Sequence, residues 1–186
     1  MASILPMDEL NRVSEDIRYM FGYGQLPQSK EAEEDIIDEL LDLFLIAYAM
    51  GNDVTNRNLS SNYDPSVEEV MAAVDAKVAG KTWRERVSEY FANGGTGSDI
   101  ARIADTEMHR IANTAAFNTA KKSGAKYKTW VTMLDDRVRE THDYLEGITV
   151  DIDEDFYTYD GDHAPAPGSF ELAENNVNCR CELLFS

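Results

Sequence analysis

The stretch Lys128-Thr-Trp-Val-Thr-Met-Leu-Asp-Asp-Arg-Val-Arg-Glu-Thr-His142 decides the fold of the second half of the chain. Residues 128–134 mix β-branched and aromatic side chains, which predicts a short strand with two usable faces. Asp135 or Asp136 can accept hydrogen bonds from the free amides that open a helix. We therefore expect a strand that turns into one or two turns of helix over residues 137–144.

The end of the chain carries a second motif, Asn178-Cys179-Arg180-Cys181. With the first stretch it forms an ordered series: Trp130, Asp135, Val138, Arg139, His142, Gly147, Phe156, Pro167, Gly168, Asn178, Cys179, Arg180 and Cys181. This series resembles the C-terminal domain of the phage Mu protein F-like minor head proteins. Several independent matches in one order are far more specific than any single match.

A helical stretch upstream extends the resemblance. Its matching positions are Thr106, Glu107, His109, Arg110, Asn113, Ala115, Gly124 and Lys128. Glu107 and Arg110 lie three residues apart on a helix, so they can share a face and pair. With Asn113 they form a polar row, which we interpret as a tie between the helix and nearby loops. A row that holds a substrate is the alternative.

The resemblance implies a noncatalytic phage minor head protein that acts in head morphogenesis, at or near the portal vertex. The implied partners are the portal, the capsid or scaffold proteins and copies of the chain itself, with packaged DNA involved only indirectly. The implied location is the virion, after assembly in the host cytoplasm. The alternative is a phage-encoded effector or enzyme that uses the region of His142, Cys179 and Cys181, since such domains are sometimes fused to toxins.

The charge balance argues against a DNA-coating role. The 186 residues contain 17 Lys and Arg against 35 Asp and Glu, a formal net charge of -18, which repels a phosphate backbone. The basic group Lys121, Lys122, Lys126 and Lys128 is interpreted as a solvated helix end. No apolar run of about twenty residues and no basic leader is present, so we expect a cytoplasmic protein without a membrane segment.

Apolar periodicity predicts a helical N-terminal part. The expected helices cover residues 7–19, 30–50, 65–80, 83–91 and 100–123, separated by a polar loop at 52–63 and a flexible glycine-rich connector at 93–97. The expected caps are Ser29, Asp64, Thr82 and either Ser98 or Asp99, and Gly51 is expected to end the second helix. We divide the chain into a helical region of unassigned role, residues 1–95, and a Mu F-like domain, residues 96–186.

The helix predicted over residues 30–50 is apolar around most of its circumference between Ile36 and Met50. Such a helix either lies at the centre of a bundle or covers a partner. Core burial is the commoner case. A subunit interface is the alternative if the N-terminal helices are too few to cover that face.

The C-terminal part is predicted to hold a small, mainly antiparallel sheet. Ile148 to Val150 is a candidate strand, and Cys179 to Phe185 is expected to form the last strand. The predicted class is therefore α+β, a helical N-terminal part packed with this sheet.

His142, Cys179 and Cys181 are the candidate metal ligands. Cysteines two apart on a strand point to one face, so both sulfurs could meet one zinc ion together with the imidazole. His163, Asp135 or a water would supply a fourth ligand. Buried thiols beside a hydrogen-bonded histidine are the favoured interpretation. A Cys179 nucleophile with His142 as its base is weaker, because a strand at the chain end offers no open cleft.

The charged residues of the central stretch are interpreted as structural. Asp135, Arg137 and Arg139 form a cluster that fixes the turn after the strand, with Arg180 packing across it. In this interpretation the two motifs form a latch between the middle and the end of the domain. The structural residues of the motif are then Glu107, Trp130, Asp135, Arg137, Arg139, His142, Gly147, Asn178, Cys179, Arg180 and Cys181.

Overall fold

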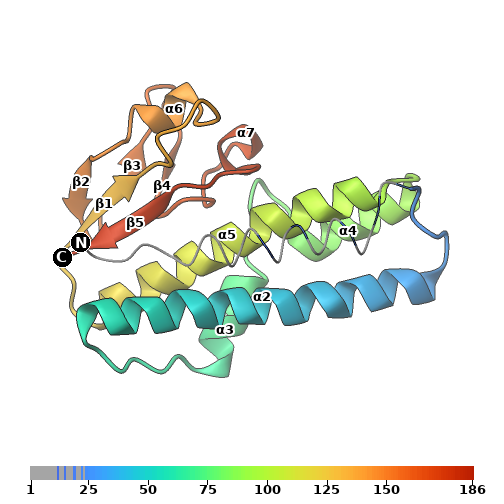
Figure 1. Ribbon diagram of the computed structural model, residues 1–186, viewed down its shortest axis with the longest axis horizontal. Coiled ribbons are helices and arrows are strands. Elements are labelled where there is room, and N and C mark those ends of the chain that lie inside the picture. The colour runs from blue at the N-terminus through green and yellow to red at the C-terminus, as the bar shows by residue number, and fades with distance from the viewer. Residues whose placement is uncertain (1–11, 13–14, 16–18, 20–21, 23) are drawn as a thin grey trace.

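Two long helices run side by side in the same direction and form the base of the protein. The computed structural model describes residues 12, 15, 19, 22 and 24–186, and the helix expected over residues 7–19 lies largely outside them. Helices α2 (Lys30–Leu59) and α5 (Gly97–Lys122) are the long pair (Figure 1). The shorter α3 (Val67–Val74) and α4 (Trp83–Ala92) lie in the connection between them.

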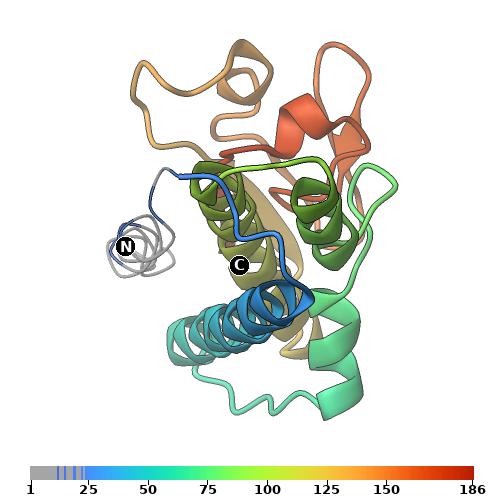
Figure 2. The same cartoon turned by 90° about the vertical axis from the view of Figure 1, so that its right-hand side faces the viewer.

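The sheet and the short C-terminal helices pack on the face of α5 that points away from α2, as Figure 2 shows. The main sheet has the order β2-β1-β5, formed by β1 (Tyr127–Val131), β2 (Thr149–Asp151) and β5 (Glu182–Phe185). Both pairings are antiparallel. Strands β3 (Phe156–Tyr157) and β4 (His163–Ala164) form a separate antiparallel pair. The predicted α+β class is confirmed.

The starts of α2 and α5 are tied together. Ser29 caps α2 through a hydrogen bond from the Ala32 amide, as predicted. The glycine-rich loop before α5 bonds to the segment before α2: Leu26 N donates to Gly95 O at 2.9 Å, and Gly97 N donates to Gly24 O at 3.0 Å. The prediction of a flexible connector was therefore wrong.

The cap of α5 is Thr96, not Ser98 or Asp99 as expected. Asp99 instead accepts hydrogen bonds from the Thr96 amide at 2.9 Å and from the Thr96 hydroxyl at 2.8 Å. The carboxylate thus supports the first turn from the third helical position.

Gly51 lies inside α2 and does not end it. A Cβ atom at this position would come within 2.2 Å of the Ala112 carbonyl oxygen on α5. The glycine therefore permits the close approach of the two long helices. Asn52 then accepts a hydrogen bond from the Thr119 hydroxyl at 2.6 Å. The residues expected to begin a loop remain helical to Leu59, and Ser60 ends the helix in the left-handed region, with φ 52°.

The wide apolar face of α2 serves the protein's own core. Its buried apolar residues are Ile36, Leu40, Phe44, Ala47, Tyr48 and Val54. Phe44 meets Trp83 of α4 edge to face, with ring centroids 5.0 Å apart. Ile46 is left 54% exposed. Core burial, the favoured interpretation, therefore accounts for most of this face.

Of the two connecting helices, α4 follows the prediction, whereas α3 differs from it in its cap and in its end. Thr82 and Glu85 form the predicted capping box of α4. Helix α3 is capped by Ser66 with Glu69, not by Asp64, and it ends at Val74 rather than near residue 80. The reason for the early end is a tight turn in which Val78 and Lys81 exchange backbone hydrogen bonds.

The central stretch turns more sharply than predicted. Strand β1 ends at Val131, three residues before the expected end, and Leu134 adopts a φ of 53°. Asp135 Oδ1 accepts from the Arg137 amide at 3.1 Å, but this closes a turn and not a helix. The helix is limited to α6 (Glu140–Asp143), with Arg139 at its N-cap.

A second apolar cluster forms the core of the C-terminal part. Its buried members are Trp130, Leu145, Phe156, Ala164, Ala166, Phe170, Cys179, Cys181 and Leu183. Phe185 packs against this cluster and against the helical core. Helix α7 (Ala173–Asn176) lies between β4 and β5 in the chain. The proposed division between residues 1–95 and 96–186 stays a prediction, and the helical core draws on both parts.

Among the described residues, no helix is both long and apolar enough to span a bilayer.

Gly51→Ala should destabilise the protein by roughly 1–3 kcal/mol, the usual cost of overpacking a core contact. The reason is that the added methyl group meets the Ala112 backbone, which cannot move aside cheaply. Urea unfolding would measure the change. Gly24→Ala is the matched control, because no atom lies within 4 Å of a Cβ built there. A Gly51→Ala variant as stable as the control would contradict the close-approach argument.

Candidate functional site

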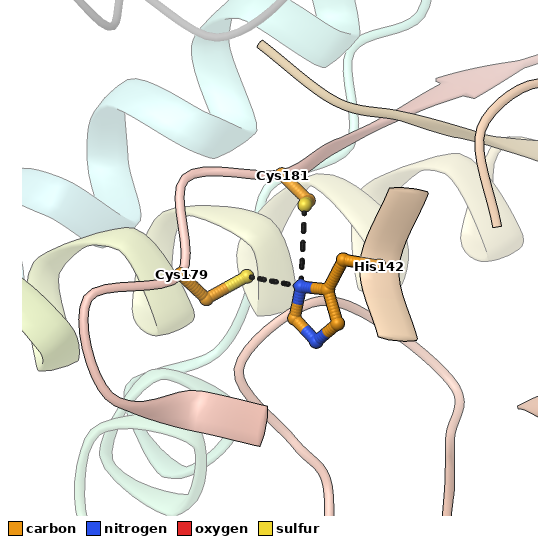
Figure 3. Close-up of side chains that lie close together, drawn as sticks. All are labelled: His142, Cys179 and Cys181. Carbon is orange, nitrogen blue, oxygen red and sulfur yellow. Dashed lines mark hydrogen bonds between the residues drawn. The ribbon is translucent and has the colours of Figure 1, made fainter. Parts of the chain in front are cut away.

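Three buried side chains meet at one point in the C-terminal part. His142 Nδ1 lies 3.6 Å from Cys179 Sγ and 3.4 Å from Cys181 Sγ. His142 is 1% exposed, and each cysteine is 4% exposed. Figure 3 shows the imidazole entering from α6 and the two thiols from the segment before β5. Within the described part of the chain, these are the three potential metal donors that lie within 4.8 Å of one another.

The cysteines reach the imidazole from an irregular segment. The last strand begins at Glu182, not at Cys179 as predicted, so strand alternation does not align the thiols. Asn178 instead adopts a φ of 56°, and its amide donates to the Thr106 hydroxyl of α5 at 3.2 Å. Asn113, also on α5, donates to the Cys181 carbonyl at 3.0 Å. Helix α5 therefore sets the course of this segment.

Aromatic rings fix the orientation of His142. Its ring stacks on Phe170, with centroids 5.3 Å apart and planes at 30°. Trp130, which is fully buried on β1, meets the same ring edge to face at 5.4 Å. Gly147, in the left-handed region, donates its amide to the Trp130 carbonyl and so returns the chain to β1 after α6. The imidazole is thus held in an apolar setting.

The pKa values of the two buried thiols shift in opposite directions because the thiols contact each other. Hydrogen bonding from Cys181 and from His142 holds the pKa of Cys179 well below its usual value, against the effect of burial. The same contact with Cys179, together with burial, raises the pKa of Cys181.

The predicted fourth ligands lie elsewhere. His163 Nδ1 is 2.8 Å from Asp155 Oδ2, and Asp135 is paired with Arg180. Neither belongs to the group of three donors. A cavity of about 10 Å³ borders His142 and the two cysteines, and it is lined further by Met133, Arg137, Val138, Arg139, Asn178 and Arg180. It has room for about one water molecule.

Beside the three donors, a charged clasp joins the central stretch to the end of the chain. Both guanidinium nitrogens of Arg180 donate to Asp135, at 2.9 and 2.7 Å. This pairing holds the pKa of Asp135 well below its usual range. Arg139 donates to the Val177 carbonyl at 2.6 Å, whereas the Arg137 side chain is 73% exposed and 3.4 Å from Asp135. Arg139 and Arg180, rather than Arg137, make the contacts between the central stretch and the C-terminal segment.

The polar row on α5 is a buried network. Arg110 Nε donates to Glu107 at 2.6 Å, and its two terminal nitrogens donate to the Ala73 and Val74 carbonyls at 2.9 and 3.1 Å. Arg86 of α4 donates to the second Glu107 oxygen. The row therefore ties α5 to α3 and α4, and through Asn113 to the C-terminal segment.

Asp162 is a buried structural residue that sequence reasoning missed. Its carboxylate accepts hydrogen bonds from the amides of His163, Glu171 and Leu172 and from the Asn175 side chain. An Asp in an acidic segment rich in exposed residues carries no sequence signal of this role, because its partners come from a loop further along the chain.

The prediction that Lys128 belongs to a solvated helix end was wrong. This side chain is fully buried, donates to the Pro165 carbonyl at 2.8 Å, and lies 4.5 Å from the centre of the Phe117 ring. Burial lowers its pKa to about 8. It is therefore not part of a solvated helix end, whereas the Lys121 and Lys122 side chains are half exposed or more and pair with Asp153 and Glu69.

The fold and the site define a small α+β module whose last segment brings two cysteines to a buried histidine. Residues 66–184 match the family model of the Phage Mu protein F like proteins. The match covers more than half of the chain, and the chain belongs to this family.

Two curated relatives are similar to parts of the chain. One is the Minor head protein GP7 of Bacillus phage SPP1, 34% identical over 85 residues, which cover 44% of this chain and 28% of that protein. The other is the NAD(+)--arginine ADP-ribosyltransferase EFV of Enterococcus faecalis, 32% identical over 146 residues, which cover 60% of this chain and 30% of that protein. The chain thus spans less than a third of either relative's length. No solved structure matches.

Glu107→Gln should destabilise the protein by about 3 kcal/mol, because it leaves the buried Arg110 guanidinium without its counter-charge. Denaturant unfolding followed by circular dichroism would measure this. The control is Glu89→Gln, whose partner Lys81 is 50% exposed, so its cost should stay below about 1 kcal/mol. Equal losses in the two variants would refute a special role for the buried network.

Arg180→Lys should lower the melting temperature, because a point charge cannot make both hydrogen bonds to the Asp135 carboxylate. Arg137→Lys is the matched control, since it changes an exposed partner of the same carboxylate, and its melting temperature should equal that of the wild type. Differential scanning calorimetry would compare them. If both variants melt like the wild type, the clasp contributes nothing to stability.

Proposed function

We propose that the chain is a phage minor head protein with a structural, noncatalytic role in head morphogenesis. Membership of the Phage Mu protein F like family over residues 66–184 carries the proposal. The likeness to the Minor head protein GP7 of Bacillus phage SPP1 supports it as well. Together these findings favour a component of the phage head over a free-standing enzyme.

The setting of the three donors supports a role other than catalysis. The imidazole and both thiols are at most 4% exposed, and the adjoining cavity of about 10 Å³ has room for about one water molecule. A catalytic thiol needs an accessible, electropositive position. The effector or enzyme alternative therefore gains no support from this site. The activity named for the Enterococcus faecalis relative belongs to a protein of which this chain covers 30%.

A larger hollow of about 440 Å³ lies between α4, α5 and α7. Its volume suits a small molecule, but its charged side chains are engaged with one another. Arg86 pairs with Glu107, Lys81 with Glu89, and Arg102 donates to the Tyr90 hydroxyl. These contacts connect α4 to α5 and to the preceding turn, which favours a structural use of the charges over the binding of a charged substrate.

We infer that the protein acts at or near the portal vertex, bound to the portal and to capsid or scaffold proteins, with self-association as a further contact. The formal net charge of -18 favours protein partners and leaves packaged DNA only indirectly involved. On this proposal the chain is found in virions, after assembly in the host cytoplasm.

Quantitative mass spectrometry of purified virions tests the proposal. For the phage that encodes the chain, we expect the chain in every preparation, in copy numbers comparable with the portal and far below the major capsid protein. Particles lacking the gene should be fewer and less infectious, and wild-type gene supplied in trans should restore them. A chain that is abundant in infected cells but absent from virions would overturn the proposal.

A further inference from the structure

We propose that His142, Cys179 and Cys181 bind one zinc ion through Nδ1 and two thiolates, with the fourth position facing the small cavity and occupied by a water. This inference concerns the chain alone and does not depend on the proposed role in the phage head. It rests on distances, on hydrogen-bonding capacity and on charge.

The distances suit tetrahedral coordination. With Zn–S bonds of about 2.3 Å, a Zn–N bond of about 2.05 Å and angles of about 109°, a nitrogen and a sulfur bound to one zinc lie about 3.6 Å apart. The observed separations from His142 Nδ1 are 3.6 Å to Cys179 Sγ and 3.4 Å to Cys181 Sγ. Both nitrogen–sulfur separations thus match the spacing that the ion requires, and all three donor atoms lie within 4.8 Å of one another.

The two thiols converge on one nitrogen of the imidazole. A neutral imidazole nitrogen offers either one lone pair or one proton. Both sulfurs face His142 Nδ1, so this nitrogen serves one thiol, and the two thiols also bond to each other. A cation placed between the three atoms accepts electron pairs from all of them. The convergence of both thiols on one atom is therefore better explained by a shared ion.

The charge balance favours a dication at this buried point. Two thiolates neutralise the two positive charges of zinc, so the bound centre carries no net charge into the interior. The Trp130 and Phe170 rings cover the imidazole, and Arg137, Arg139 and Arg180 line the adjoining cavity. The ion would let both thiols ionise.

The donor set selects the metal. Thiolates and an imidazole suit zinc, whereas calcium and magnesium prefer oxygen ligands. The chain contains 2 cysteines, fewer than the four thiolates that usually hold an iron–sulfur cluster. The neighbouring cavity takes about one water molecule, which completes four-fold coordination.

The ion would reinforce the clasp between Asp135 and Arg180. It joins α6, which supplies His142, to the segment before β5, which supplies the cysteines. These elements are far apart in the chain, so the bond closes a long loop and restricts the unfolded state. Zinc binding would then add directly to the free energy of folding.

The test is the metal content of the full chain, produced with a tag that lacks histidines, in zinc-supplemented medium and without chelator. Mass spectrometry of the elements should find about one zinc per folded chain. Cys179→Ser, Cys181→Ser and His142→Phe should each lose this zinc. His163→Phe is the matched control, because His163 lies outside the donor group, and it should keep the metal.

Two further measurements keep the test decisive if a variant fails to fold. Cobalt added to metal-free wild-type protein should produce thiolate-to-cobalt charge-transfer absorption. Removal of zinc by a chelator should lower the melting temperature of the wild type. The same treatment should leave the melting temperature of a folded Cys179→Ser variant unchanged. Folded wild-type protein with only traces of zinc would overturn the proposal. Zinc content equal in wild type and the folded cysteine variants, or copper in place of zinc, would overturn it as well.

Discussion

The docking of the chain's last segment against β1 and α5 is the constraint on which the C-terminal structure depends. Strand β5 pairs with β1, placing Leu183 opposite Trp130. In the segment before β5, Arg180 donates two hydrogen bonds to Asp135. Long-range contacts of this kind repay a large loss of chain entropy, so they form together or not at all. Once they form, the cysteines have one position available, beside His142.

Helix α5 connects this clasp to the helical half. At its contact with α2, Gly51 lets the two backbones approach closely at Ala112. On α5, Glu107 and Arg110 are buried and bind α3 and α4, while Asn113 holds the Cys181 carbonyl. Buried polar groups need satisfied partners. The helix therefore fixes the position of every element around it, and the site inherits this rigidity.

Much of the fold was predictable where the signal is local. The caps at Ser29 and Thr82 were found because each bonds backbone within its own first turn. Gly51 was misread, since a glycine that ends a helix and one that admits a neighbour look alike in sequence. Lys128 was misread for a similar reason: its burial depends on Phe117 and Pro165, which are distant in the chain. Signals of tertiary origin are invisible to local patterns.

The candidate site shows the same division. The sequence could name His142, Cys179 and Cys181, because their residue types and spacing suit a shared ion. It supplied the wrong geometry, since the thiols were expected on a strand and they lie in the irregular segment before β5. What aligns them is the tether of that segment to α5, together with the rings that orient the imidazole. The residue types thus indicate the chemistry of a site, whereas long-range contacts of the fold determine its geometry. Two buried thiols that converge on one nitrogen lie there because such contacts hold both chain segments in place.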